Sequence, residues 1–86
     1  MEIILKDEAL LDLEFWKKSG NKQIQKKISE LISDISEHPE IGLGKPEKLK
    51  HKLTGAWSRR INSEHRIIYE VHENEIHILS MKGHYQ

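Results

Sequence analysis

Hydrophobic residues recur at helical spacing through the first half of the chain and alternate with polar residues in the second half. Residues 2–5 form an apolar run that predicts a strand, because it is too short for a helix. Apolar residues at three- and four-residue intervals then predict a helix that Asp7 caps and that ends near Ser19. The strongest periodicity starts at Asn21 and predicts a second helix that ends before Pro39, with an apolar face formed by Ile24, Ile28, Leu31, Ile32 and Ile35.

Residues 39–56 contain both prolines and three of the five glycines, a composition typical of a loop, and we expect one helical turn within it at 47–50. Short polar connections separate three strand-like runs at 57–61, 65–71 and 75–81. Such spacing predicts an antiparallel meander. The chain is therefore expected to be a single α+β domain over residues 1–86, with an N-terminal strand and two helices packed on one face of a mainly antiparallel sheet.

The composition narrows the class of protein. The 86 residues include 36% hydrophobic and 33% charged side chains, enough apolar surface for a packed core. The absence of cysteine excludes disulfides, thiolate metal sites and cysteine nucleophiles. The N-terminal stretch resembles neither a signal peptide nor a membrane span, so we expect a cytoplasmic protein with no membrane partner.

The formal net charge is zero, but the charges are separated along the chain. Residues 1–44 carry six lysines and nine acidic residues, a net charge of −3, whereas residues 45–86 carry eight basic and five acidic residues, a net charge of +3. Within the second half, residues 45–66 hold seven Lys or Arg and two Glu. This segment predicts a polyanionic partner, with Trp57 and Tyr85 available to stack on bases, while a solvated lysine-rich loop beside a core tryptophan remains the alternative.

Alternation in the first run of the meander separates its arginines. Trp57, Arg59 and Ile61 share one face, and Ser58 and Arg60 share the other. At least one arginine must therefore lie beside apolar neighbours, where its guanidinium would be held in a fixed orientation.

The basic segment also contains acid–base groups, namely Glu47, His51 and His65, and His84 follows near the C-terminus. Metal-free RNA cleavage needs a base for the 2′-OH, cations for the charged phosphorane and an acid for the 5′ oxygen. Glutamate, arginine and histidine can fill these roles. An exposed ion pair for Glu47 and a frayed end for His84 are the alternatives for each residue by itself.

Other chemistries find little support. The six histidines show no metal-binding motif, and His72 and His77 are expected to be exposed residues on either side of a turn. Neither a phosphate-binding loop nor a nucleophile elbow is present. The sequence therefore predicts no metal and no cofactor.

Four motifs in a fixed order give the most specific signal: GKPEKLKH at 44–51, LTGAWSRRI at 53–61, EHRIIY at 64–69 and GHY at 83–85. With them, the chain resembles the Txe/YoeB family over essentially its whole length. The resemblance implies a RelE-like fold and the toxin of a type II toxin–antitoxin pair. It further implies a ribosome-dependent endoribonuclease that cuts mRNA in the A site and so stops translation.

The resemblance also assigns roles to individual residues. It implies that Glu47 is the general base, that Arg66 stabilises the scissile phosphate and that His84 is the general acid. RNA or phosphate contacts are implied for Lys50, His51, Arg59 and Tyr85.

The implied partners are a small antitoxin of the YefM/Axe type, the ribosome with its A-site mRNA, operator DNA through the antitoxin only, and a second copy of the chain. A toxin of the same fold without catalysis, such as a ParE-like gyrase inhibitor, or a simple RNA-binding module is the alternative function. Such a binder would have no use for the combination of Glu47, Arg66 and His84.

Overall fold

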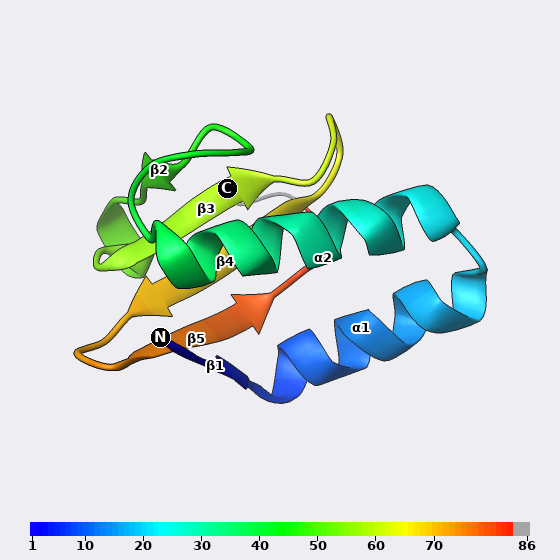
Figure 1. The fold of residues 1–86 in the computed structure, drawn as a ribbon, viewed down its shortest axis with the longest axis horizontal. Coiled ribbons are helices and arrows are strands. Elements are labelled where there is room, and N and C mark those ends of the chain that lie inside the picture. Colours follow the sequence, from blue (N-terminus) through cyan, green and yellow to red (C-terminus); the bar gives the residue numbers. More distant parts are fainter. Residues whose placement is uncertain (84–86) are drawn as a thin grey trace.

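Two helices and a five-stranded sheet make up the computed structural model, which describes residues 1–83 (Figure 1). The helices are α1 (Asp7–Ser19) and α2 (Lys22–Glu37). The strands are β1 (Glu2–Leu5), β2 (Glu47–Lys48), β3 (Ala56–Arg60), β4 (Arg66–Val71) and β5 (Glu75–Ser80). Their order in the sheet is β1-β5-β4-β3-β2, with β1 parallel to β5 and every other pair antiparallel. The predicted α+β fold, with its N-terminal strand and mainly antiparallel sheet, is confirmed.

Charge and backbone conformation set the limits of α1. Asp7 and Glu8 lie in its first turn and Lys17 and Lys18 in its last, so each end carries the charge that favours the helix dipole. Asp7 is the first helical residue rather than the cap we expected, because Lys6 occupies the cap position in an extended conformation. The helix ends at Gly20, which adopts the left-handed conformation that glycine tolerates best.

The second helix follows the predicted pattern closely. The Asn21 side chain accepts a hydrogen bond from the Ile24 N–H at 3.1 Å and caps the helix. Its apolar face is buried through Ile24, Ile28, Leu31 and Ile35. Neither helix in residues 1–83 is both long enough and apolar enough to cross a membrane.

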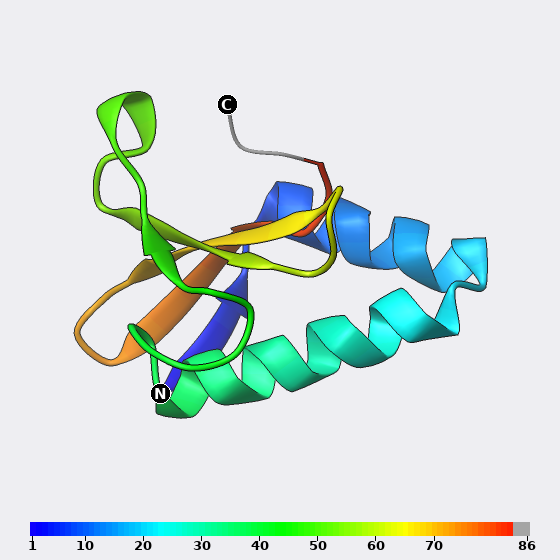
Figure 2. The same ribbon diagram turned by 90° about the horizontal axis from the view of Figure 1, so that it is seen from above.

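The main core lies between the helices and one face of the sheet. Both helices contribute to this core, together with Ile67 and Tyr69 of β4 and Ile76 and Ile78 of β5. On the opposite face, which we call the open face, the described residues form a small apolar cluster of Leu49, Ala56 and Ile68. Figure 2 shows α2 on one side of the sheet and the short 3₁₀ turn η1 (His51–Leu53) on the other. The helices thus leave the open face available for a partner.

The segment after Pro46 differs from the prediction. The helical turn expected at 47–50 is absent, because Glu47 and Lys48 form β2 and pair with the edge of β3. Glu47 lies opposite Ser58, and the Leu49 N–H continues the pairing by donating to the Ala56 carbonyl at 2.9 Å. Backbone hydrogen bonds to β3, whose paired residues lie 9 to 11 positions further along the chain, therefore outweigh the local preference for a turn.

Candidate functional site

Glu47 and Arg66 line one cleft of about 230 Å³ on the open face. The sheet register explains their proximity, because Glu47 of β2 lies opposite Ser58 of β3, and Arg60 of β3 lies opposite Arg66 of β4. Lys45 lies in the loop just before β2, and the cleft is lined by Lys45, Pro46, Glu47, Ser58, Arg60 and Arg66. Two of the three residues implied to be catalytic therefore share one cavity.

Cations predominate in this cleft. Among the described residues, Lys45, Arg60 and Arg66 line it together with one carboxylate, that of Glu47. The Arg66 guanidinium is held by two backbone acceptors, since its Nη1 donates to the Asn62 carbonyl at 2.9 Å and to that of His65 at 3.2 Å. A phosphate group bearing one or two negative charges suits such a site.

Lys50 and His51 lie in a neighbouring groove of about 470 Å³, whose wall is formed by Glu47, Lys48, Leu49, Lys50 and His51. Glu47 lines both hollows, so this carboxylate stands between the cleft and the groove. His51 has a positive φ of 60°, where the chain turns sharply into η1. The structure therefore places two of the four residues predicted to contact RNA or phosphate beside the predicted base.

The first helix fixes the chain where it leaves β5. The Trp16 indole Nε1–H donates to the Met81 carbonyl at 2.8 Å, and this contact is buried. The Met81 N–H donates to the Asp12 carboxylate at 2.9 Å. Two side chains of α1 thus hold both backbone groups of one residue, three positions before His84 in the sequence.

Gly83 is hydrogen-bonded to the start of β4. Its N–H donates to His65 Nδ1 at 2.9 Å, and its carbonyl accepts from the Arg66 N–H at 3.0 Å. Because His65 Nδ1 accepts a hydrogen bond, this imidazole carries its proton on Nε2. His84 and Tyr85, the implied acid and the implied base-contacting residue, lie outside the described residues.

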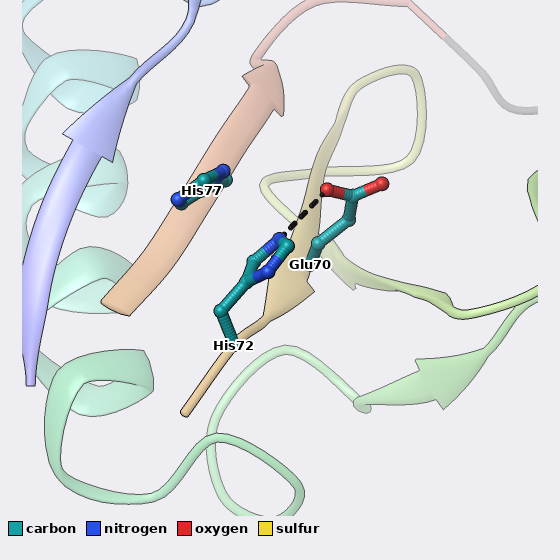
Figure 3. A group of neighbouring side chains, drawn as sticks. All are labelled: Glu70, His72 and His77. Carbon is teal, nitrogen blue, oxygen red and sulfur yellow. Dashed lines mark hydrogen bonds and ion pairs between the residues drawn. The ribbon is translucent and has the colours of Figure 1, made fainter. Parts of the chain in front are cut away.

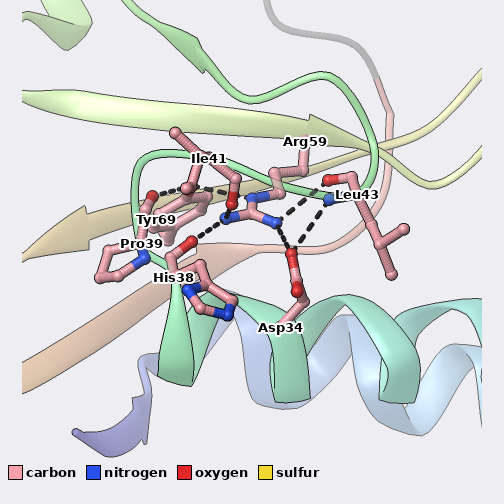
Figure 4. A network of polar contacts seen from close by, with 7 residues as sticks. All are labelled: Asp34, His38, Pro39, Ile41, Leu43, Arg59 and Tyr69. Atoms are coloured by element: carbon pink, nitrogen blue, oxygen red, sulfur yellow. Dashed lines mark hydrogen bonds and ion pairs between the residues drawn. The ribbon is translucent and has the colours of Figure 1, made fainter.

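Arg59, which the resemblance implies to contact or neutralise phosphate, is fully buried at 0% exposure. Its side chain points towards the helices, and all five N–H donors of its guanidinium have acceptors within the protein (Figure 4). The acceptors are the Tyr69 hydroxyl, the Asp34 carboxylate and the carbonyls of His38, Ile41 and Leu43. Arg59 has no donor left for RNA, so the expected phosphate contact is wrong. It is instead the arginine that alternation predicts among apolar neighbours.

Two ionisable groups complete this buried network. The Leu43 N–H and the Arg59 guanidinium both donate to Asp34 and hold the pKa of that carboxyl below its ordinary value of 3.8. Burial raises the pKa of the Tyr69 phenol above its ordinary value of 10.0. The phenol therefore stays protonated and donates to the Pro39 carbonyl at 2.6 Å while it accepts from Arg59.

The network holds the loop that leads to Glu47. Three carbonyls of residues 38–43 accept from Arg59, and glycines let the loop approach closely. A Cβ at Gly42 would lie 2.1 Å from an Asp34 carboxylate oxygen, and one at Gly44 would lie 2.8 Å from Leu31. Arg59 is therefore a positioning residue for the cleft rather than part of its surface.

Sequence reasoning did not single out Lys45, Ser58 or Arg60 as site residues. The signals were present, because Lys45 and Arg60 belong to the basic segment and alternation places Ser58 and Arg60 on one face. The missing information was which face the helices would leave open. Sequence periodicity gives the two faces of a strand but does not distinguish them.

Comparison with known proteins identifies the family. The profile described as "YoeB-like toxin of bacterial type II toxin-antitoxin system" matches residues 5–85. Toxin YoeB of Escherichia coli K12 is 45% identical over 85 residues, which cover 99% of this chain and 100% of the relative.

Two solved structures from Staphylococcus aureus have the same fold. YoeB in a YoeB–YefM complex is 45% identical with a TM-score of 0.88, and a YoeB dimer is 44% identical with a TM-score of 0.89. Each comparison covers 99% of this chain and 98% of the other. With a matching profile and relatives of this identity over nearly its full length, the chain belongs to the YoeB-like toxin family of bacterial type II toxin–antitoxin systems.

Proposed function

We propose that this chain is an mRNA endoribonuclease whose active site is the cleft on the open face. One observation carries the proposal: Glu47, from β2, and Arg66, from β4, line the same cavity together with Lys45 and Arg60. A carboxylate among three cations provides a proton acceptor beside a phosphate site. A protein that only binds RNA or blocks a protein target would not need this pairing.

The proposed reaction is an internal phosphoryl transfer. Glu47 accepts the proton of a ribose 2′-OH, and the oxygen attacks the adjacent phosphorus. Arg66, aided by Lys45 and Arg60, stabilises the negative charge that develops on the phosphorane oxygens. The bond to the 5′ oxygen breaks as that oxygen receives a proton, which leaves a 2′,3′-cyclic phosphate and a 5′-hydroxyl.

We assign the leaving-group proton to His84. Its support is the tether described above, since Gly83 is bonded to the backbone of Arg66 and His84 is the next residue in the sequence. Tyr85 is proposed to pack against a base. Lys50 and His51 are proposed to contact the RNA backbone along the groove that adjoins Glu47.

Ribosomal positioning of the substrate is the second part of the proposal. Glu47 is exposed, and a surface cleft of this size encloses only a small part of an RNA chain. An open site gains most from a substrate already held in an in-line geometry. We therefore propose mRNA in the ribosomal A site as the physiological substrate.

The S. aureus relative has been solved both with YefM and as a dimer. By analogy, we propose that a YefM-like antitoxin binds this chain and covers its cationic cleft, and that two copies of the chain can associate. Operator DNA would be reached through the antitoxin. An excess of antitoxin should then abolish cleavage.

Cleavage of a defined mRNA on programmed ribosomes, mapped by primer extension, tests the function. Glu47→Gln and His84→Gln should each lower the rate by about 10²–10⁴-fold, the usual contribution of a general base or acid. Glu64→Gln is the matched control, because Glu64 is an exposed glutamate two residues before Arg66 and does not line the cleft. Naked RNA should be cut far more slowly than ribosome-bound mRNA.

No site-specific cuts from folded wild-type protein would refute the proposal and favour a non-catalytic toxin of this fold. Equal rates on naked and ribosome-bound RNA would refute ribosomal positioning alone.

A further inference from the structure

A second group of chemically active side chains lies on the open face, at the hairpin between β4 and β5. Glu70 and His77 are direct cross-strand partners, and His72 follows Glu70 by two residues. Figure 3 shows the three side chains converging above these strands. Their ligand atoms all lie within 4.8 Å of one another.

Pairwise contacts within the group are close. His72 Nε2 lies 3.0 Å from a Glu70 carboxylate oxygen, and the two imidazole rings stack with centroids 4.0 Å apart. Two ligand atoms on a tetrahedral zinc ion are about 3.3 Å apart, given bonds of about 2.0–2.1 Å. A shared ion would therefore require the ligand atoms to approach from separations of up to 4.8 Å and the two stacked rings to turn so that one nitrogen of each points at the ion.

A fourth residue orients one of the imidazoles. His77 Nε2 lies 2.8 Å from a Glu75 carboxylate oxygen. Metal-bound histidines usually donate their second ring N–H to a carboxylate in this way, which leaves the other nitrogen as the ligand. Glu75 would thus present His77 Nδ1 to an ion.

We propose that Glu70, His72 and His77 form a binding site for a divalent transition metal ion of the Zn²⁺ class. Two imidazoles and one carboxylate are a donor set that zinc accepts, with water in the remaining position. The His72 and Glu70 side chains are 47% and 41% exposed, so an ion can enter directly from solvent. The bound ion would link β4 to β5 next to their connecting turn.

This site is separate from the proposed active site. Glu70 lies four residues after Arg66 on β4, a distance of about 13 Å along an extended strand. None of its three ligands lines the cationic cleft. We therefore expect the ion to stabilise the hairpin and to take no part in phosphoryl transfer.

Isothermal titration of ZnCl₂ into the tag-free, metal-free full chain tests the proposal. Wild type should show one saturable site. His72→Asn and His77→Asn should each abolish it, and Glu75→Gln should weaken it by about 10–100-fold, as expected for a residue that orients a ligand. His51→Asn, which changes an exposed histidine on another element, should leave the titration unchanged.

Thermal unfolding with and without Zn²⁺ provides a second measurement. Wild type should melt at a higher temperature with zinc, and EDTA should reverse the shift, whereas the two histidine variants should fold normally but show no shift. Absence of saturable binding to wild type would overturn the proposal. Zinc binding that persists in both His72→Asn and His77→Asn, or that is lost in His51→Asn, would also overturn it.

Discussion

Arg59 and Arg60 are adjacent in sequence but point to opposite faces of β3, and this difference can be tested by identical substitutions. Arg59 is fully buried, and all five of its N–H donors are bonded. Arg60 is exposed and lines the cationic cleft. Arg59→Met should destabilise the fold, whereas Arg60→Met should impair catalysis and leave the fold intact.

The expected loss of unfolding free energy follows from the hydrogen-bond partners that Arg59→Met leaves without a donor. Removing one member of a buried ion pair usually costs about 3–5 kcal/mol. Asp34 keeps its hydrogen bond from the Leu43 N–H, and the carbonyls of the exposed loop can be hydrated, so we expect about 3 kcal/mol. For a domain of this size, that loss lowers Tm by roughly 12–24 °C. Arg60→Met should change stability by less than about 0.5 kcal/mol.

Urea unfolding followed by tryptophan fluorescence measures both variants, because Trp16 is buried in the core. Arg59→Lys serves as an intermediate, since an ammonium keeps the charge but offers three donors in place of five. A loss of less than about 1 kcal/mol in Arg59→Met would refute the structural role of the network. Reduced cleavage by a stable Arg59→Met protein, together with full activity in Arg60→Met, would reverse the assignment of the two residues.

Three further predictions concern residues that position the site. The pKa of Asp34 is lowered in the folded protein, so the native state binds the Asp34 proton less tightly than the unfolded state does. The ionised carboxylate therefore stabilises the fold fully above about pH 3.8, and this stabilisation is lost as the pH falls through the lower native pKa. The difference in urea midpoint between wild type and Asp34→Asn should shrink over that pH range. Gly44→Ala should cost at least about 1–2 kcal/mol, because Gly44 has a φ of 78° and a Cβ there would crowd Leu31; an unchanged melting temperature would contradict this reading. Trp16→Phe should cost about 1–3 kcal/mol by leaving the Met81 carbonyl without its donor, and should also lower cleavage if α1 positions the end of the chain; calorimetry and primer extension measure the two effects.

Sequence reasoning predicts the helices and strands well where side-chain periodicity reflects burial. The stripe from Ile24 to Ile35 can face only one core, and alternation in β4 sends Ile67 and Tyr69 to that core. It fails at 47–50, where pairing with β3, outside the local window and 9 to 11 positions further along, decides the conformation. Local preferences carry no information about such a partner.

In the site, too, the sequence predicts some features, whereas others depend on contacts between separate segments. Glu47 and Arg66 are recognised by motif, and the sheet register explains why they meet. Arg59 belongs to another of the four motifs, yet its role depends on Asp34 and on a loop folded around its guanidinium, contacts between residues 16 to 25 positions apart. Charge alone therefore misassigns Arg59, whereas alternation along the strand already indicates an arginine beside apolar neighbours.

The two helices lie opposite the cleft but hold the loop that leads to Glu47 and the stretch of chain that precedes His84. Near the C-terminal end of α2, Asp34 and the His38 carbonyl bind Arg59, and Arg59 binds the loop that leads to Glu47. A cation beside the end of a helix is also favoured by the helix dipole. On the other side, α1 binds Met81 and so fixes the path of the chain towards His84.

The proposed base and acid therefore lie on segments that are anchored to different helices, and Arg66 lies on the strand between these anchors. Loosening either anchor should move one partner of the acid–base pair relative to the phosphate while the other stays in place. Since proton transfer depends steeply on donor–acceptor geometry, such changes should lower kcat more than they weaken RNA binding. Substitutions of Lys45, whose charge is available to a phosphate in the free and the reacting state alike, should instead weaken binding more than they lower kcat.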